Sequence, residues 1–319
     1  MRRPIKRQVR PIIPLLLALL LIGCRTPVIP TQSVLPTVAL PPSPLATPTL
    51  MPQAFSGQRA YAHVLRQVAF GPRPPGSSAL RLTGDTIKAA LEQVGWAVEE
   101  QTFTYRETPI RNLIARKGTG PVVILGAHYD TRRQADRDQA HPTAPVPGAN
   151  DGASGVAVLL ELARTLDMSR VPYQVWLAFF DAEDQGGLDG WEWIVGSSYM
   201  AEHLTVQPEF VVIVDMVGDA DQQLYLEQNS APQVRDRIWA VAAGLGYGAY
   251  FINRPGYSLL DDHTPFLRRG LRAVDIIDFD YPYWHTTADT ADKVSPASLE
   301  RVGRTLKAFL EQPSPMGSP

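Results

Sequence analysis

An apolar run followed by a cluster of acids organises this sequence: Val175-Trp176-Leu177-Ala178-Phe179-Phe180, then Asp181-Ala182-Glu183-Asp184. A continuous run of aromatic and branched side chains predicts a strand buried on both faces of a sheet. Sites in open α/β sheets lie outside the carboxyl ends of the strands. Glu183 and Asp184 are therefore candidate functional residues and not simply a solvated acidic turn.

Around this stretch, apolar strands alternate with amphipathic helices. The pattern predicts two helices before residue 95 and strands at 97–105, 111–116, 122–127, 175–180, 210–214 and 273–277. Further helices are expected at 154–166, 197–203, 235–245 and 296–310. Continuous strands separated by helices predict a three-layer α/β/α sandwich with a mixed, mostly parallel central sheet.

Composition limits the function classes. The chain has 319 residues, 45% of them hydrophobic and 19% charged, which suits one large core. The net charge of −2 implies no broad basic surface for nucleic acid. We therefore expect a substrate that is recognised by a local site and no nucleic-acid partner. A monomer is also expected.

The N-terminus has the pattern of a lipoprotein signal peptide. A basic start is followed by an apolar run at 12–21 and by Gly23-Cys24. We expect residues 1–23 to be removed and Cys24 to be lipidated, so that the protein is exported and anchored to the outer face of a bacterial membrane. An uncleaved membrane anchor is the alternative. Because Cys24 is the only cysteine, the mature chain has no disulfide and no cysteine ligand.

The rest of the chain divides into three parts. Residues 24–55 are rich in proline and threonine and predict an extended tether. Residues 56–312 carry the alternating pattern of the catalytic domain, and 313–319 are expected to form a flexible tail.

Several predicted strands carry potential metal ligands to one edge of the sheet. His128 and Asp130 follow the strand at 122–127, Asp215 follows 210–214, and His285 follows 273–277 after a loop. Asp151 lies in Gly148-Ala149-Asn150-Asp151-Gly152 before a helix, where capping is the alternative role. Histidine and carboxylate ligands without cysteine suit a catalytic zinc with an open position.

These motifs resemble the zinc-dependent aminopeptidases of the co-catalytic type, and more closely the glutaminyl cyclases that share their fold, the zinc exopeptidase (phosphorylase/hydrolase-like) fold. The nearer match is carried by Asp261-Asp262-His263-Thr264-Pro265-Phe266-Leu267-Arg268-Arg269-Gly270 and by Trp284-His285-Thr286. The similarity covers roughly residues 58 to 312.

The resemblance implies a role for each matched position. Asp151, Asp184 and His285 would bind zinc, with Glu183 as the general acid and base. In a cyclase, Asp215 and Asp261 would hold the substrate amine. The reaction would convert the N-terminal glutamine of a peptide to pyroglutamate and release ammonia. Trp284, Trp191 and Tyr281 are the expected pocket residues.

Two alternatives remain open. In an aminopeptidase, Glu183 would activate water, and His128 and Asp215 would bind a second zinc bridged by Asp151. Asp130 would then orient His128. The chain would hold one zinc as a cyclase and two as an aminopeptidase. A lipid-anchored binding protein with a degenerate site is the non-enzymatic alternative.

The sequence departs from the family pattern in two places. Asp184 stands where these families usually have glutamate, and the tryptophan after Glu183 is not at the expected offset. Asp262 is expected to cap the helix that follows it. Asp289 and Asp292 are expected in a solvated loop.

Overall fold

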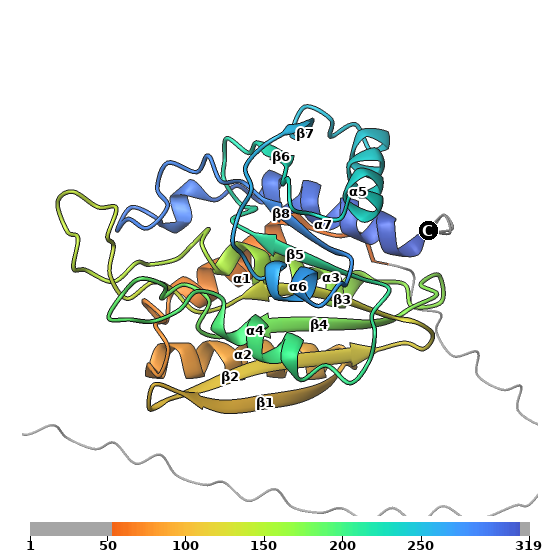
Figure 1. Ribbon diagram of the computed structural model, residues 1–319. Helices are drawn as coiled ribbons and strands as arrows, with labels where there is room; N and C mark the ends of the chain where they lie inside the picture. Colours follow the sequence, from red (N-terminus) through yellow and green to blue (C-terminus); the bar gives the residue numbers. More distant parts are fainter. Residues whose placement is uncertain (1–52, 313–319) are drawn as a thin grey trace, which may run out of the picture. The chain divides into compact units, whose positions relative to one another are not determined.

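The computed structural model describes residues 53–312. A central sheet has the strand order β1-β2-β4-β3-β5-β8 (Figure 1). Its strands are β1 (Ala97–Tyr105), β2 (Thr108–Lys117), β3 (Val122–His128), β4 (Gln174–Phe180), β5 (Phe210–Asp215) and β8 (Ala273–Ile277). β4, β3, β5 and β8 are mutually parallel, whereas β1 and β2 pair antiparallel at one edge.

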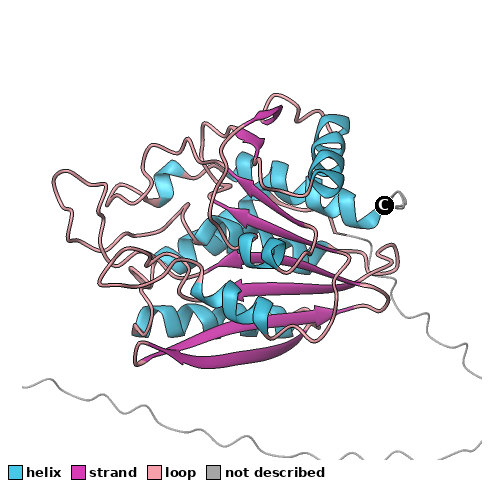
Figure 2. Cartoon of the chain, in the orientation of Figure 1, coloured by secondary structure: helices cyan, strands magenta, loops and turns pink. Residues whose placement is uncertain are grey.

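Helices cover both faces of this sheet (Figure 2). One layer contains α1 (Gly57–Val68), α2 (Ser78–Gln93), α3 (Ala153–Thr165), α5 (Pro232–Gly244) and α7 (Pro296–Glu311). The other contains α4 (Val195–Glu202) and α6 (Thr264–Arg268). The predicted three-layer sandwich with a mostly parallel mixed sheet is confirmed.

The apolar run of β4 explains why the strand needs two covering layers. Val175, Leu177 and Phe179 pack into the core beneath α3, whereas Trp176 and Phe180 pack beneath α4 and α6. Successive side chains of a strand point to opposite faces. Each face of β4 is therefore apolar, and its central position forces the acidic turn after Phe180 to the edge of the sheet.

The structure adds elements that the pattern did not predict. A short second sheet pairs β6 (Leu224–Leu226) with β7 (Phe251–Pro255), and a 3₁₀ turn, η1 (Ala291–Lys293), precedes α7. Among the described residues, no helix is long and apolar enough to cross a membrane.

The predicted boundary between tether and domain falls slightly late. Phe55 lies one residue before the expected start of the domain, yet its side chain is buried in the core and contacts Gly303 of α7. The folded part therefore includes Phe55. The predicted signal peptide, Cys24, most of the tether and the C-terminal tail lie outside the described residues.

Candidate metal centre and active site

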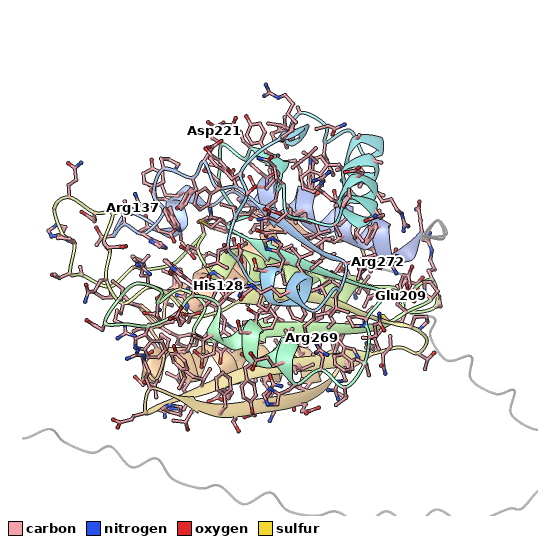
Figure 3. The ribbon with its side chains drawn as sticks, viewed as in Figure 1. His128, Arg137, Glu209, Asp221, Arg269 and Arg272 are labelled. Atoms are coloured by element: carbon pink, nitrogen blue, oxygen red, sulfur yellow. The ribbon has the colours of Figure 1, made fainter. Side chains whose placement is uncertain are left out.

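The strand ends bring the predicted residues to one edge of the sheet. His128 ends β3 (labelled in Figure 3) and Asp215 ends β5, while Glu183 and Asp184 follow β4. His285 follows β8 after a short loop. All five side chains are buried. A parallel sheet thus collects ligands that are far apart in sequence.

Two groups of potential metal ligands share Asp151. Asp151, Asp184 and His285 form one group, and His128, Asp151 and Asp215 form the other. His285 Nε2 lies 3.0 Å from Asp184 Oδ1 and 3.8 Å from Asp151 Oδ2. His128 Nε2 lies 3.1 Å from both Asp151 Oδ1 and Asp215 Oδ1. The two carboxylate oxygens of Asp151 therefore face different histidines.

The first group has the chemistry that zinc requires. Asp151 Oδ2 and Asp184 Oδ2 are buried and accept no hydrogen bond within the described part of the chain. A buried carboxylate oxygen without a partner carries a desolvation cost that a bound cation removes. One imidazole nitrogen and carboxylate oxygens with no thiol form a typical catalytic zinc set. The residues present fit a zinc ion. Asp184 is one methylene shorter than the glutamate usual in these families, yet its carboxylate lies in one ligand group with Asp151 and His285.

Aromatic rings and an unusual backbone fix His285. Trp284 and Trp193 lie against its imidazole, with ring centroids 3.9 Å and 5.9 Å away. His285 has φ +56°, and Ala182 and Met216, next to Glu183 and Asp215, have φ +59° and +44°. Such values are rare outside glycine and persist where the surrounding structure imposes them. The turns after β4 and β5, and the loop that carries His285, thus hold strained residues that aim the site side chains.

Asp130 connects His128 to the acidic turn. Its Oδ1 lies 3.4 Å from His128 Nδ1, the position expected of an orienting carboxylate. The same carboxylate accepts the backbone N–H groups of Glu183 (3.0 Å) and Asp184 (3.3 Å), and the side-chain amide of Gln185. Asp130 therefore positions the acid–base residue as well as the histidine.

Asp289 holds the loop of Asp151, and its predicted place in a solvated loop is wrong. The Asp289 carboxylate is fully buried and accepts the backbone N–H groups of Asn150 (2.9 Å) and Asp151 (3.1 Å), and the Tyr281 hydroxyl (2.7 Å). Asp151 itself does not cap α3, because the N-cap is Gly152 at φ +91°. The Asp151 side chain is thereby free to face the ligand groups.

A cavity of about 200 Å³ opens onto the first ligand group. Its apolar walls include Ile277, Phe279, Trp193 and Trp284, and its acidic floor includes Asp261. Trp284 lines the cavity as expected.

Two expected pocket residues do not line this cavity. Trp191 packs on Ile110, Ala182 and Tyr105, because the loop after Asp184 turns it away from the metal. Tyr281 lies beneath the site, where its hydroxyl donates to Asp289. Trp193 takes the place predicted for Trp191.

The acids at the base of the cavity have perturbed proton affinities. Burial raises the pKa of Glu183 well above its ordinary value, and nearby Asp184 adds to this effect, while His128 opposes it. Burial likewise raises the pKa of Asp215 to about 7, again opposed by His128. Groups of this kind suit proton transfer near neutral pH.

Asp262, which follows Asp261, does not have the role that the sequence predicted. The N-cap of α6 is His263, and no side chain caps that helix, so Asp262 does not have the expected capping role. Its buried carboxylate lies near Asp261 and Glu183, and it raises the pKa of Glu183. Asp262 thus belongs to the same acidic cluster.

Arg132 was not predicted, since its neighbours come from distant segments. Its guanidinium donates to the carbonyl of Asp184 (3.2 Å), lies 3.5 Å from that carboxylate, and stacks 4.7 Å from the Trp193 ring. Arg132 also forms a two-pronged pair with Asp136, which in turn lies 3.3 Å from His285 Nδ1. Only the run of charges at 132–138 could have drawn attention to this segment.

Comparison with known proteins defines the class of this chain. The family model of Peptidase family M28 matches residues 112–310. The chain therefore belongs to Peptidase family M28.

Within that family, glutaminyl cyclases are prominent among its relatives. It is 37% identical to the glutaminyl cyclase of Porphyromonas gingivalis, covering 82% of this chain and 99% of that one with a TM-score of 0.77. It is 28% identical over 299 residues to the glutaminyl-peptide cyclotransferase-like protein of Mus musculus, covering 80% of this chain and 75% of the relative. A leucine aminopeptidase precursor of Bacteroides thetaiotaomicron VPI-5482 is 31% identical, with a TM-score of 0.78 over 83% of this chain and 99% of that one.

Proposed function

We propose that this protein is a zinc-dependent glutaminyl-peptide cyclotransferase. The observation that carries the proposal is the small cavity with apolar walls, which Glu183 lines together with the Asp151–Asp184–His285 group and the acids Asp215 and Asp261. A cavity of this size suits one glutaminyl residue whose side-chain amide is bent back toward its own α-amine. The similarity to glutaminyl cyclases supports the same reaction.

Asp151, Asp184 and His285 would hold the zinc. When bound, zinc polarises the side-chain carbonyl of the N-terminal glutamine. Glu183 accepts a proton from the α-amine as the amine nitrogen forms a bond to the carbonyl carbon of the side-chain amide, Cδ. Glu183 then delivers that proton to the departing nitrogen as the C–N bond of the side-chain amide breaks, which gives pyroglutamate and ammonia.

Asp215 and Asp261 bind the attacking amine in this mechanism. Both line the cavity, and they lie close enough for Asp261 to raise the pKa of Asp215. Two neighbouring carboxyl groups can accept hydrogen bonds from an amine while Glu183 takes a proton from it. The walls formed by Trp284, Trp193 and Phe279 keep bulk water from the reacting carbonyl.

The aminopeptidase alternative rests on the second ligand group. His128, Asp151 and Asp215 could hold a further ion, and an enzyme with two zincs would use Glu183 to activate water. In the structure, however, His128 lies between Asp151, Asp215 and Asp130. These carboxylates raise its pKa well above the ordinary value in spite of burial. A protonated His128 and a second zinc ion would each balance the charge of these carboxylates, so the number of zinc ions bound separates the two enzymes.

Product analysis separates the two reactions. We expect a peptide with N-terminal glutamine to lose ammonia and keep all of its residues, and a matched peptide with N-terminal leucine to remain unchanged. Release of free leucine or free glutamine would instead support the aminopeptidase. Glu183→Gln is the matched control, since it keeps the shape of the side chain and removes its acid–base function.

We also propose that the enzyme is an exported monomer held by a lipidated Cys24 on the outer face of a bacterial membrane, where it acts on peptides with a free N-terminus. The basic, apolar and Gly23-Cys24 segments of the N-terminal sequence support this location. A labelled fatty acid fed to the cells should be incorporated into the wild type and not into Cys24→Ala. A wild-type protein that carries no label would contradict lipid anchoring.

A further inference from the structure

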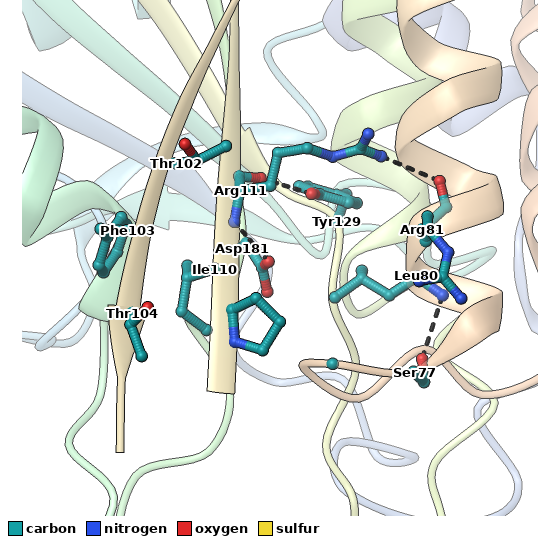
Figure 4. A pocket seen from close by; sticks show the side chains of 12 residues that line it. Ser77, Leu80, Arg81, Thr102, Phe103, Thr104, Ile110, Arg111, Tyr129 and Asp181 are labelled. Carbon is teal, nitrogen blue, oxygen red and sulfur yellow. Dashed lines mark hydrogen bonds between the residues drawn. The ribbon is translucent and has the colours of Figure 1, made fainter. Parts of the chain in front are cut away.

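A second cavity lies away from the metal centre. It has a volume of about 450 Å³ and opens between α2 and the β1–β2 edge of the sheet (Figure 4). Its walls include the apolar side chains of Leu80, Phe103, Pro109 and Ile110. This volume is typical of sites for small molecules, which are mostly apolar with a few fixed polar groups.

A buried carboxylate lies at the floor of this cavity. Asp181 is 2% exposed, and its Oδ2 accepts the backbone N–H of Arg111 (2.9 Å). Its Oδ1 accepts no hydrogen bond from any described residue. Figure 4 shows the Asp181 carboxylate between Ile110 and Tyr129, across the cavity from the Leu80 side chain. One oxygen at the floor of a mostly apolar cavity is thus left without a donor.

The cations around the cavity do not satisfy this oxygen. The Arg111 guanidinium is turned outward, where it pairs with Asp85 (2.8 Å) and donates to the carbonyl of Arg81 (2.9 Å). The Tyr129 hydroxyl donates to the carbonyl of Arg111. Burial and the nearby Asp130 raise the pKa of Asp181 well above its ordinary value, and the outward-turned Arg111 opposes this rise only in part. The backbone N–H of Ala182 lies near this carboxylate, but Oδ1 accepts no well-formed hydrogen bond from a described residue, so it can accept one from a bound ligand.

We propose that this cavity binds a small ligand with an apolar body and a protonated amine, the amine at Asp181 Oδ1, and that its occupancy is coupled to the acidic turn of the active site. An ammonium group supplies the missing donor and the missing charge together. The apolar body fits against Leu80, Phe103 and Ile110.

The coupling follows from where the floor residues lie in the chain. Asp181 is two residues before Glu183, in the same turn after β4. Tyr129 lies between His128 and Asp130 and has its backbone on the same strand end. A ligand that binds the Asp181 carboxylate and shifts it therefore also shifts the turn that positions Glu183. By linkage, substrate in the active site changes the affinity of the cavity to the same extent.

Isopentylamine and its isosteric alcohol, 3-methylbutan-1-ol, test the binding. Calorimetry on the zinc-loaded enzyme should give an affinity for the amine at least about tenfold above that for the alcohol, since a charge-assisted hydrogen bond replaces a weaker one. Asp181→Asn should abolish this preference. Equal affinities of the wild type for the two probes would overturn the proposal.

Thr102→Trp shows whether the amine binds in this cavity or at the catalytic acids. Thr102 lines the mouth from an exposed position on β1, where tryptophan is well tolerated and can fill the space without entering the core. The variant should bind neither probe, and saturating isopentylamine should change kcat in the wild type but not in Thr102→Trp. The proposal would be refuted if Thr102→Trp bound the probes as the wild type does, or if isopentylamine left the kcat of the wild type unchanged. Binding is measured without substrate, so the result is independent of which reaction the enzyme catalyses.

Discussion

Replacing Asp289 by asparagine should weaken zinc binding although Asp289 is not a metal ligand. Its Oδ1 accepts the N–H of Asn150 and the hydroxyl of Tyr281, and its Oδ2 accepts the N–H of Asp151. Asparagine can keep the first two bonds. Its amide nitrogen would then face the N–H of Asp151, and two donors cannot bond to each other. The backbone of Asp151 must move.

The size of the effect follows from the bond that is lost. The buried N–H of Asp151 left without an acceptor costs roughly 1–3 kcal/mol of unfolding free energy, and relief of the buried Asp289 charge offsets part of this cost, since burial raises the pKa of that carboxyl to about 7. Residues that orient a ligand typically change metal affinity by about 10–100-fold. We therefore expect zinc affinity, measured by competition with a chromophoric chelator, to fall by about 10–100-fold. Urea unfolding of the zinc-free protein measures the stability.

The matched control is Asp292→Asn, because Asp292 lies in the same loop with an exposed carboxylate. This variant should bind zinc as the wild type does. A zinc affinity of Asp289→Asn within about twofold of the control would refute the reasoning, since Asp151 would then keep its place without Asp289.

Three other changes have distinct expected outcomes. Glu183→Gln should lower kcat by about 10²–10⁴-fold with zinc content unchanged, and loss of the metal in this variant would contradict its assigned role. Trp193→Ala should raise KM, whereas Trp191→Ala should lower stability by about 3–5 kcal/mol and leave KM unchanged; equal effects on KM would contradict the described cavity. Burial raises the pKa of Asp278 to about 7, so the folded protein holds this proton more tightly than the unfolded chain and stability falls as the pH rises from about 4 to 7. Asp278→Asn should remove that fall. In urea unfolding at pH 8 the variant should be more stable than the wild type, by at most roughly 4 kcal/mol. A stability difference between the two proteins that is the same at pH 4 and pH 8 would argue against this account.

The strands and the main site residues could be predicted because local sequence determines them. The run Val175–Phe180 is apolar on both faces, which fixes β4 as a central strand, and the carboxyl end of such a strand is where Glu183 and Asp184 must lie. The same reasoning applies to His128 and Asp215. Each is the last residue of a buried parallel strand.

The supporting residues could not be predicted, because their roles depend on loop paths. Asp289 looks like a surface acid until the chain brings it to the backbone of Asp151, 138 residues away. The choice between Trp191 and Trp193 depends on how the loop after Asp184 turns, which no periodicity specifies. The cavity above Asp181 likewise forms between α2 and the antiparallel β1–β2 edge of the sheet, and neither segment alone indicates it.

The central claim is that the group of Asp151, Asp184 and His285 makes this chain a one-zinc cyclase. The most direct measurement adds zinc in steps to the metal-free enzyme and follows ammonia release from a peptide with N-terminal glutamine. We predict that ammonia release rises linearly and reaches its plateau at one zinc per chain, with pyroglutamyl peptide as the product. Activity that appears only with the second zinc, together with release of free amino acids, would contradict the account.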